Sequence, residues 1–356
     1  MNTLASALPN AIVQTWPPFV LVAGLLLVGV VASTDGLFQA VGTWLARLPG
    51  GGITLFISLM ALVAVTTVVL NLDTSVVFLT PIVLHSARQR GIDETAFAYG
   101  AVFMSNSASL LLPGSNLTNL LVMAERHQSG TAFASAMFPA WVAAVVVTTG
   151  VLLLWRRRDL RQTGSPVDGS VHFEVGLGLA GVIAAAALVL SLSDPAPPVL
   201  ALGLVLAIGQ MRRSRLGWRE ALKAASVVPL SGLFVIAVGL GTLARLWGAP
   251  GRLMASAGPW ATAWIGAGVA SLVNNLPAAV MLSSRPPAHP HALLVGLDLG
   301  PNLVVTGALS AILWMRVARS EGANVSAGRY SKIGLILVPV SMVAALVSVQ
   351  LFVPGA

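Results

Sequence analysis

Long apolar stretches broken by few charges are the feature that most limits what this chain can fold into. A helix that crosses the hydrocarbon core of a bilayer needs about 17 to 25 residues, and these stretches approach or reach that length. Only 9% of the residues are charged and 56% are hydrophobic, whereas a soluble domain carries about a quarter charged residues. The sequence therefore predicts an all-α polytopic membrane protein, with clear spans at Phe19–Ser33, Trp141–Trp155, Val175–Leu192, Val227–Leu240 and Ile333–Val353.

Basic residues in the short loops predict how the chain is oriented. The strongest basic loop is Arg156–Arg161, and the next runs from Arg212 to Lys223. Because basic loops stay on the cytoplasmic side, the favoured path leaves sixteen of the twenty Lys and Arg residues inside. Arg126, Arg252 and Arg285 then lie outside, and Arg245 lies near a membrane end. We expect a multi-pass protein of the bacterial inner (plasma) membrane whose basic loops are cytoplasmic.

Several classes of function are disfavoured by what the sequence lacks. The net charge of +8 sits in loops between spans and not on one face, so no nucleic-acid partner is expected. The chain has no cysteine, which excludes disulfides and thiolate metal sites, and no glycine-lysine nucleotide-binding loop occurs. His289 and His291 have no carboxylate nearby in sequence. We therefore predict no enzyme activity, no cofactor and no metal site.

The start of the chain carries no charge before Thr34. A secretory signal peptide begins with basic residues, so we expect the first span to remain in the mature protein.

Two apolar segments fit the path only if each enters and leaves the membrane on the same side. The first runs from Ile53 to His85 and turns near Asn71–Thr74. The second runs from Pro259 to Ser284 and turns near Asn274–Pro277. These segments are predicted to be re-entrant hairpins, the first open to the cytoplasm and the second open to the outside.

Each hairpin is followed by a long segment with a polar or glycine-rich break, at Pro113–Asn119 and at Asp298–Gly307, and then by a plain span. The same order with opposite orientation is the inverted-repeat plan of many secondary transporters. We predict about eight spans, two re-entrant hairpins and two broken helices. Residues 1–162 form the first membrane repeat, with three spans and a hairpin, and residues 163–356 form the second, with five spans and a hairpin.

Polar side chains within the predicted spans gather at the two turns and the two breaks. Amides and hydroxyls both donate and accept hydrogen bonds, so such a site suits a small oxygen-bearing solute or a hydrated ion. The alternative is that these groups only join helices to one another. The residues predicted to bind the solute are Asn71, Asp73, Thr74, Ser115, Asn116, Asn119, Asn274, Asn275, Asn302 and Thr306.

Three charged residues lie in or near the predicted spans. Asp73 and Asp298 are candidate proton carriers, because a buried carboxylate without a fixed cation partner can take up a proton. The alternative for either is a helix cap at the break. Arg245 either pairs with a carboxylate or lies at the outer interface with its stem along the apolar surface.

Five short motifs carry a resemblance to a known group of transporters. They are Leu79–Val83 (LTPIV), Ala108–Leu110 (ASL) followed by Ser115–Leu117 (SNL) and Asn119, Asn274–Pro277 (NNLP), Asp298–Pro301 (DLGP), and Gly307–Leu309 (GAL) with Leu313-Trp314 (LW). The order of these motifs is that of the ion-transporter superfamily, and from about Phe19 to the C-terminus the chain resembles that superfamily. That superfamily contains arsenite/antimonite efflux permeases, sodium/proton antiporters, and citrate and dicarboxylate carriers, and the likeness is strongest to the arsenite permeases.

The sequence departs from the pattern of that family in three places. The aspartate of the first turn comes one residue later, at Asp73, and Asn106 stands near the family's aspartate before the ASL motif. The two N-terminal helices usual in the family are also expected to be missing. Asp298 is therefore the best retained carboxylate.

The resemblance implies export of arsenite or antimonite, as neutral trihydroxides, coupled to proton entry. Sodium/proton exchange and transport of a carboxylate or inorganic anion remain alternatives in the same class, and a passive channel is an alternative in another class. A carboxylate substrate would favour a fixed cation, and none occurs at the breaks. A soluble ATPase partner and a homodimer are left open.

Overall fold

The computed structural model describes residues 4–124, 128–161 and 176–353, and this part of the chain contains helices and no β-strand. Judged by length and composition, five helices could cross a membrane. They are α1 (Leu4–Thr34), α3 (Gly52–Val69), α7 (Gly130–Trp155), the stretch Trp218–Trp247 that combines α11 (Trp218–Ala224) with α12 (Val227–Trp247), and α18 (Ala327–Phe352). The shorter apolar helices α9 (Leu177–Ser191) and α10 (Ala196–Arg212) form an additional pair. The all-α membrane fold predicted from the sequence is confirmed.

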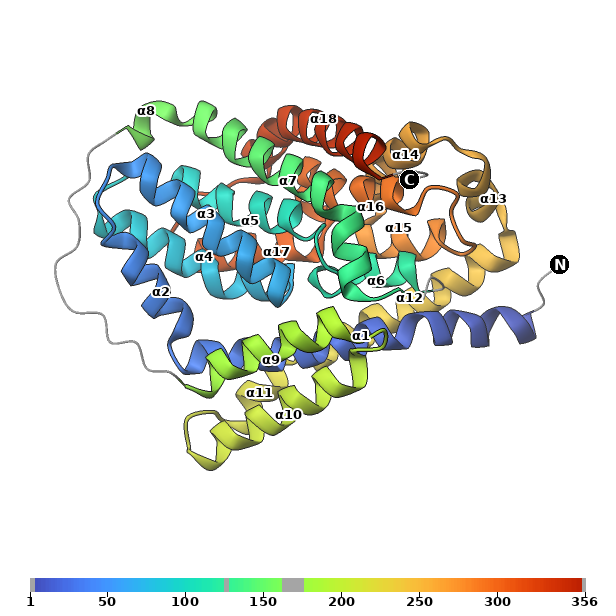
Figure 1. Ribbon diagram of the computed structural model, residues 1–356, viewed down its shortest axis with the longest axis horizontal. Coiled ribbons are helices and arrows are strands. Elements are labelled where there is room, and N and C mark those ends of the chain that lie inside the picture. The colour runs from blue at the N-terminus through green and yellow to red at the C-terminus, as the bar shows by residue number, and fades with distance from the viewer. Residues whose placement is uncertain (1–3, 125–127, 162–175, 354–356) are drawn as a thin grey trace.

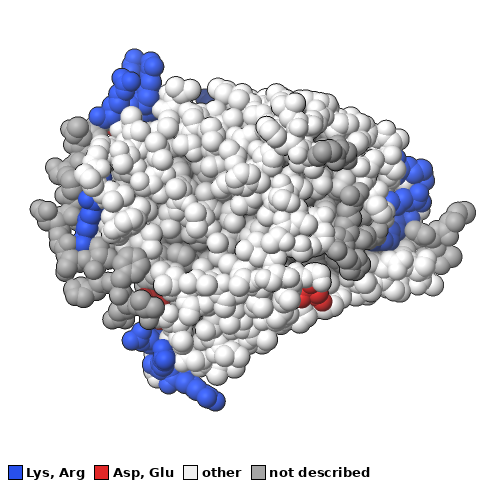
Figure 2. Space-filling model, in the orientation of Figure 1, with Lys and Arg blue, Asp and Glu red and all other residues white. Residues whose placement is uncertain are grey.

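The charges mark the two ends of the molecule. The long helices run broadly along its longest axis (Figure 1). On the face shown in Figure 2, Lys and Arg side chains gather at the two opposite ends and leave a band free of basic residues between them. This distribution matches a chain that crosses the bilayer along its long axis. Two predicted features lie outside the described residues. They are the outer loop around Arg126, at Glu125–His127, and the repeat boundary at residues 162 and 163.

The first hairpin consists of α3 and α4 (Leu72–Gln89), joined by Leu70 and Asn71. Asn71 caps α4, because its side chain accepts a hydrogen bond from the backbone N–H of Thr74 at 2.7 Å. The turn therefore ends at Asn71, and Asp73 already belongs to the first turn of α4. The broken helix that follows consists of α5 (Thr95–Ala108), a 3₁₀ turn at Pro113–Ser115 and α6 (Leu117–Met123).

The second hairpin repeats this plan after α13 (Ala249–Ser256). Helices α14 (Pro259–Val273) and α15 (Asn275–Leu282) meet at Asn274. Asn274 has a φ of 85°, which makes the reversal tight, and its side chain accepts from the N–H of Leu276 at 3.3 Å. The second broken helix consists of α16 (Pro290–Leu299), two 3₁₀ turns at Gly300–Leu303 and Val305–Gly307, and α17 (Leu309–Ser320). The two hairpins and two broken helices predicted from the sequence are present.

The two hairpins open toward opposite ends of the molecule (Figure 1). Contacts near the two ends of helix α1 show these opposite openings directly, because α1 is about 46 Å long at the usual rise per residue. Early in α1, Gln14 donates to the Ser283 carbonyl just after α15. Beyond the other end of α1, α2 (Leu37–Ala46) leads to Leu48, whose carbonyl accepts from Arg90 just after α4. This arrangement agrees with the predicted inverted repeat.

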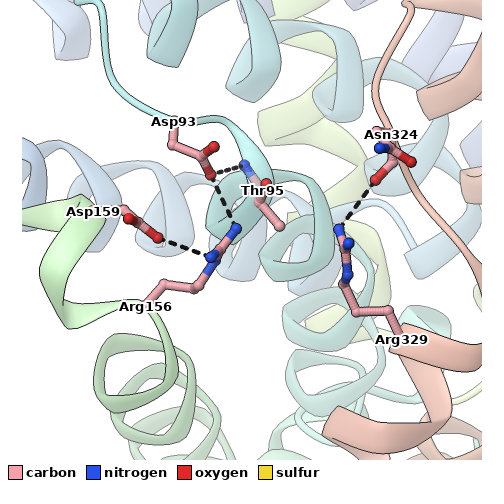
Figure 3. A network of polar contacts seen from close by, with 6 residues as sticks. All are labelled: Asp93, Thr95, Arg156, Asp159, Asn324 and Arg329. Atoms are coloured by element: carbon pink, nitrogen blue, oxygen red, sulfur yellow. Dashed lines mark hydrogen bonds and ion pairs between the residues drawn. The ribbon is translucent and has the colours of Figure 1, made fainter.

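The open end of the first hairpin is closed by polar contacts (Figure 3). Arg156, beside α8 (Arg157–Leu160), forms ion pairs with Asp159 at 3.0 Å and with Asp93 at 3.4 Å. Asp93 also accepts from the N–H of Thr95 at the start of α5. These contacts join α7 to the loop between α4 and α5 and fix the membrane end of both.

Helices α9 and α10 pack on α1 through close backbone contacts and one buried carboxylate. Gly24 of α1 faces the Leu200 backbone so closely that an added Cβ would lie 2.7 Å from the Leu200 nitrogen. At the basic end, Asp35 accepts from the Gly178 N–H at 2.7 Å and from Gln210 at 2.6 Å. Small residues allow membrane helices to approach in this way.

The close contact at Gly24 generates a prediction. Gly24→Ala should lower the free energy of unfolding by about 1–3 kcal/mol, the usual cost of overpacking, because backbone must move to admit the methyl group. Unfolding in mixed detergent micelles measures this. Gly239→Ala is the matched control in α12, because no atom lies within 4 Å of its added Cβ. Equal stability of the two variants would contradict the packing.

Candidate functional site

Both hairpin turns and both helix breaks line one small cavity of about 30 Å³. Four segments that are far apart in the sequence therefore meet at one place, together with Leu233 from α12. The lining residues are Leu72, Asp73, Asn116, Leu117, Leu233, Asn274, Asn275, Leu276, Ala308, Leu309 and Ser310.

The polar lining is made of one carboxylate, three amides and one hydroxyl. Asp73 and Asn116 come from the first half of the chain, and Asn274, Asn275 and Ser310 come from the second. Neither lysine nor arginine lines the cavity. The Asp73 carboxylate is half-buried and forms no hydrogen bond or ion pair among the described residues. The cavity is therefore polar, carries one acidic group and offers both donors and acceptors.

Asp298 of α16 is the most extensively hydrogen-bonded carboxylate beside the cavity. It is 1% exposed and accepts from Thr118 at 2.6 Å, from Asn116 at 2.9 Å and from Ser109 at 3.4 Å. All three donors belong to the broken helix of the other half of the chain. Asn116 lines the cavity as well, so a single amide connects the cavity to the buried carboxylate.

A second set of contacts joins the two broken helices directly. Asn106 of α5 donates to Asn302 at 2.8 Å and accepts from Ser310 of α17 at 3.2 Å. Tyr330 of α18 donates to the carbonyl of Pro301 at 3.0 Å, and so holds the second break from its other side. Asn106 stands near where the sequence comparison expects an aspartate, and here it acts as an uncharged link between the halves.

The unwound backbone of the first break is satisfied by its own side chains. Asn119 donates to the carbonyls of Ser109 and Leu112 at 2.8 and 3.0 Å. Ser115 donates to the carbonyl of Val68 at the tip of the first hairpin at 3.0 Å. Because free carbonyls inside a bilayer are costly, these residues allow the helix to stop at membrane depth.

The structure separates the predicted site residues into two groups. Asp73, Asn116, Asn274 and Asn275 line the cavity. The others lie around it: they cap helices, satisfy carbonyls or join segments, and Thr306 is exposed, with its carbonyl accepting from Asn274 at 3.1 Å. This surrounding group consists of Asn71, Thr74, Ser115, Asn119, Asn302, Thr306 and Asp298.

Several residues of the site are absent from the predicted set. Ser109, Thr118, Asn106 and Ser310 belong to the polar side chains that the sequence gathers at the two breaks, but they are not among the residues predicted to bind the solute. Leu233 belongs to α12, outside every turn and break. Nothing in its local sequence marks it, because only the three-dimensional packing brings it to the cavity.

Four buried polar atoms around the site have no hydrogen-bond partner among the described residues. They are Asn71 Nδ2, Thr74 Oγ1, Asn119 Oδ1 and Asn302 Nδ2. Most buried polar groups in proteins are paired. These four atoms are therefore available for hydrogen bonds that the described residues do not form.

Arg245 lies away from this site, in the last turn of α12. It is 6% exposed and donates to the Gln14 side chain and to the Gly241 carbonyl. Gln14 in turn donates to the Leu121 carbonyl at 3.0 Å. The arginine thus takes part in a junction of α1, α6 and α12, and it does not line the cavity.

The hydrogen bond between Thr118 and Asp298 generates a prediction. In a double-mutant cycle, Thr118→Val and Asp298→Ala should show a coupling energy of about 1–2 kcal/mol in unfolding, as expected for a buried bond to a carboxylate in a membrane protein. Alanine is used at Asp298 because asparagine would keep an oxygen that accepts from Thr118. Thr149→Val is the control, because Thr149 bonds only to the Val145 carbonyl of its own helix. Additive effects of Thr118→Val and Asp298→Ala would show that the bond does not stabilise the fold.

Comparison with known sequences identifies two related families. The model of a family described as "Citrate transporter" matches residues 2–300, and one described as "Arsenical pump membrane protein" matches residues 251–353. Arsenical pump membrane proteins of Yersinia enterocolitica and of Escherichia coli K12 are 26% and 27% identical to the chain. Each match extends over 88% of this chain and over 81% of the relative. An uncharacterized transporter of Mycobacterium tuberculosis is 22% identical over 92% of the chain and 84% of its own length.

A solved structure shares the fold. The YdaH transporter of Alcanivorax borkumensis, described as having an unusual topology, superposes with a TM-score of 0.58 over 98% of this chain and 88% of its own. At 16% identity this likeness concerns the fold alone. The citrate transporter model covers most of the chain, so the chain belongs to the citrate transporter family and is a membrane transporter of the citrate-transporter and arsenical-pump kind.

Proposed function

We propose that the chain is a secondary active transporter that exports arsenite or antimonite, as the neutral trihydroxide, in exchange for protons. The observation that carries the proposal is the cavity at which both hairpin turns and both breaks meet. Its amides and hydroxyl donate and accept hydrogen bonds, which suits a small solute that carries several hydroxyl groups. The relatives named arsenical pump membrane proteins support the same solute.

The charge and size of the cavity favour such a solute over citrate. A tricarboxylate would meet the Asp73 carboxylate and no basic side chain in the lining, and like charges repel strongly away from water. The volume of about 30 Å³ is also far below the range of about 300–1,000 Å³ typical of pockets for organic ligands. A neutral solute of a few heavy atoms avoids both difficulties.

We assign proton coupling to Asp298. Its carboxylate has three uncharged donors and no ion-pair partner among the described residues. Asn116 and Thr118 both donate to Oδ1 of Asp298, and Ser109 donates to Oδ2. Protonation of Oδ2 would turn that oxygen into a donor, so the Ser109 hydroxyl would have to reorient. Since Asn116 also donates to this hydroxyl at 3.3 Å and lines the cavity, loading a proton would change the hydrogen bonds offered to the solute.

Sodium/proton exchange is the second candidate, and the free carboxylate of Asp73 favours it. Carboxylate and amide oxygens are the ligands that hard cations prefer, and Asp73 shares the cavity with Asn116, Asn274 and Asn275. Both candidates use the same cavity, so the identity of the solute has to be tested by transport.

We further propose that the protein lies in the bacterial inner membrane with its strongly basic end in the cytoplasm. The two repeats would be residues 1–162 and 163–356. Solute access would alternate between the two sides as the two hairpins move with their breaks against the remaining helices.

Uptake into everted membrane vesicles tests the proposal. Vesicles that contain the wild-type chain should accumulate arsenite and antimonite when acidified inside, and a protonophore should abolish the accumulation. Citrate should not accumulate, and sodium should accumulate only if the second candidate is correct. Solute that only ever equilibrates would indicate a channel and contradict the proposal.

Asp298→Asn separates the proposed proton carrier from a structural role. The variant keeps the size of the side chain, and its uptake should fall at least about tenfold, which corresponds to about 1.4 kcal/mol in the transport barrier. Glu321→Gln is the control, because Glu321 is an exposed carboxylate after α17 that does not line the cavity. Unchanged proton-driven uptake by Asp298→Asn at equal expression would exclude this residue as the carrier.

A further inference from the structure

A second and much larger space lies between α1, α6 and α12, away from the transport cavity. Its volume is about 730 Å³, within the range of about 300–1,000 Å³ typical of ligand sites. The residues that line this groove belong to α1, α6, the start of α7, the connection from α9 to α10, α12 and the segment after α15. None of them lines the transport cavity.

The wall of the groove is mainly apolar and opens along the exposed side of α1. Val13 and Trp16 line the groove and are 66% and 40% exposed. Leu8 and Ile12 continue the exposed apolar face along the same helix. In a protein that crosses the bilayer this face meets lipid, so the groove is open to the membrane from the side.

The lining contains one carboxylate, that of the exposed Asp194 in the connection from α9 to α10, and the end at Arg245 carries polar and basic groups. Arg245 and Gln14 line it and are both buried. Ser284 and Gln128 also line it, and the Ser284 hydroxyl and the Gln128 side-chain nitrogen are buried without a hydrogen-bond partner among the described residues. Unsatisfied donors beside a buried guanidinium favour an oxygen-rich anion as the missing partner.

Two further arginines lie close together at this end. Guanidinium atoms of Arg252 and Arg285 are both within 4 Å of the point where a Cβ on Gly248 would stand. Neither side chain forms a hydrogen bond or an ion pair among the described residues. The stem of Arg285 packs against Gly251, and Arg285 lines the groove. An anion between two guanidinium groups this close would relieve their mutual repulsion.

From this geometry we propose that the groove binds an anionic phospholipid, with an acyl chain along the apolar wall and the phosphate at Arg252, Arg285 and the buried Arg245 end. The depth of Arg245 in the membrane fits a lipid phosphate, because Arg245 lies in the last turn of α12, where a membrane helix reaches the headgroup layer. A basic residue near a membrane surface attracts an anionic headgroup by about 1 kcal/mol. The lateral opening onto bilayer-facing apolar residues favours a lipid over a soluble anion.

Lipid binding to the purified full-length chain in detergent tests the proposal. Native mass spectrometry should show that phosphatidylglycerol binds at least about fivefold more tightly than phosphatidylcholine of the same chain length. Each of Arg252→Gln and Arg285→Gln should weaken phosphatidylglycerol binding about fivefold, the contribution expected for one basic residue at a membrane surface. Binding of phosphatidylcholine should not change. Both arginines are exposed, so the fold should tolerate their replacement.

Two controls decide the outcome. Arg213→Gln removes an exposed arginine after α10 and outside the groove, and it should leave lipid selectivity unchanged. Glycerol phosphate supplies the headgroup chemistry without chains and should not displace phosphatidylglycerol at millimolar concentration. Equal affinity for the two lipids, or unchanged selectivity in both arginine variants, would overturn the proposal. Displacement by glycerol phosphate would show a soluble-anion site instead and would overturn it as well.

Discussion

The rule that backbone polar groups must be satisfied inside a bilayer governs this structure. Helices satisfy their own N–H and C=O groups, and a break at membrane depth exposes several of them. In this chain each interruption brings its own partners. Asn71 and Asn274 cap the helices that restart after the two turns, and Asn119 and Ser115 take up carbonyls at the first break and the neighbouring turn. These asparagines and this serine serve the two turns and the first break, and at the second break Tyr330 donates to the Pro301 carbonyl.

Once the interruptions exist, they generate the functional site. Helix ends at the turns and breaks converge on one cavity, and their side chains bring amides, a hydroxyl and a carboxylate to it. Asp298 then couples the halves, because its donors all come from the opposite broken helix. Movement of one half relative to the other must therefore rearrange the hydrogen bonds of this carboxylate. That dependence gives a physical reason why proton loading and solute access could be linked.

Much of this arrangement follows from the sequence, because the strongest signals are local. Apolar length predicts the spans, and the motifs around Asn71, Asn116, Asn274 and Asp298 mark the turns and breaks. The turn of the first hairpin ends at Asn71, slightly earlier than the sequence predicts, because a capping asparagine begins the next helix at once. Pairings between the halves could not be read from the sequence: the contact of Asn106 with Asn302 spans 196 residues, and Leu233 reaches the cavity only through the packing of α12. The family assignment gives the fold and the class, and a polar lining without a basic side chain supports the proposed solute.

The claim that solute passes through the cavity between the turns and the breaks can be tested by blocking it. The chain has no cysteine, so the Leu309→Cys variant carries a single thiol in the cavity lining at a half-buried position. The account predicts that complete modification with a small methanethiosulfonate reagent, verified by mass spectrometry, stops solute transport. The Ser320→Cys variant, modified at the exposed end of the same helix, should transport as before. Undiminished transport after complete modification of Leu309→Cys would contradict the account.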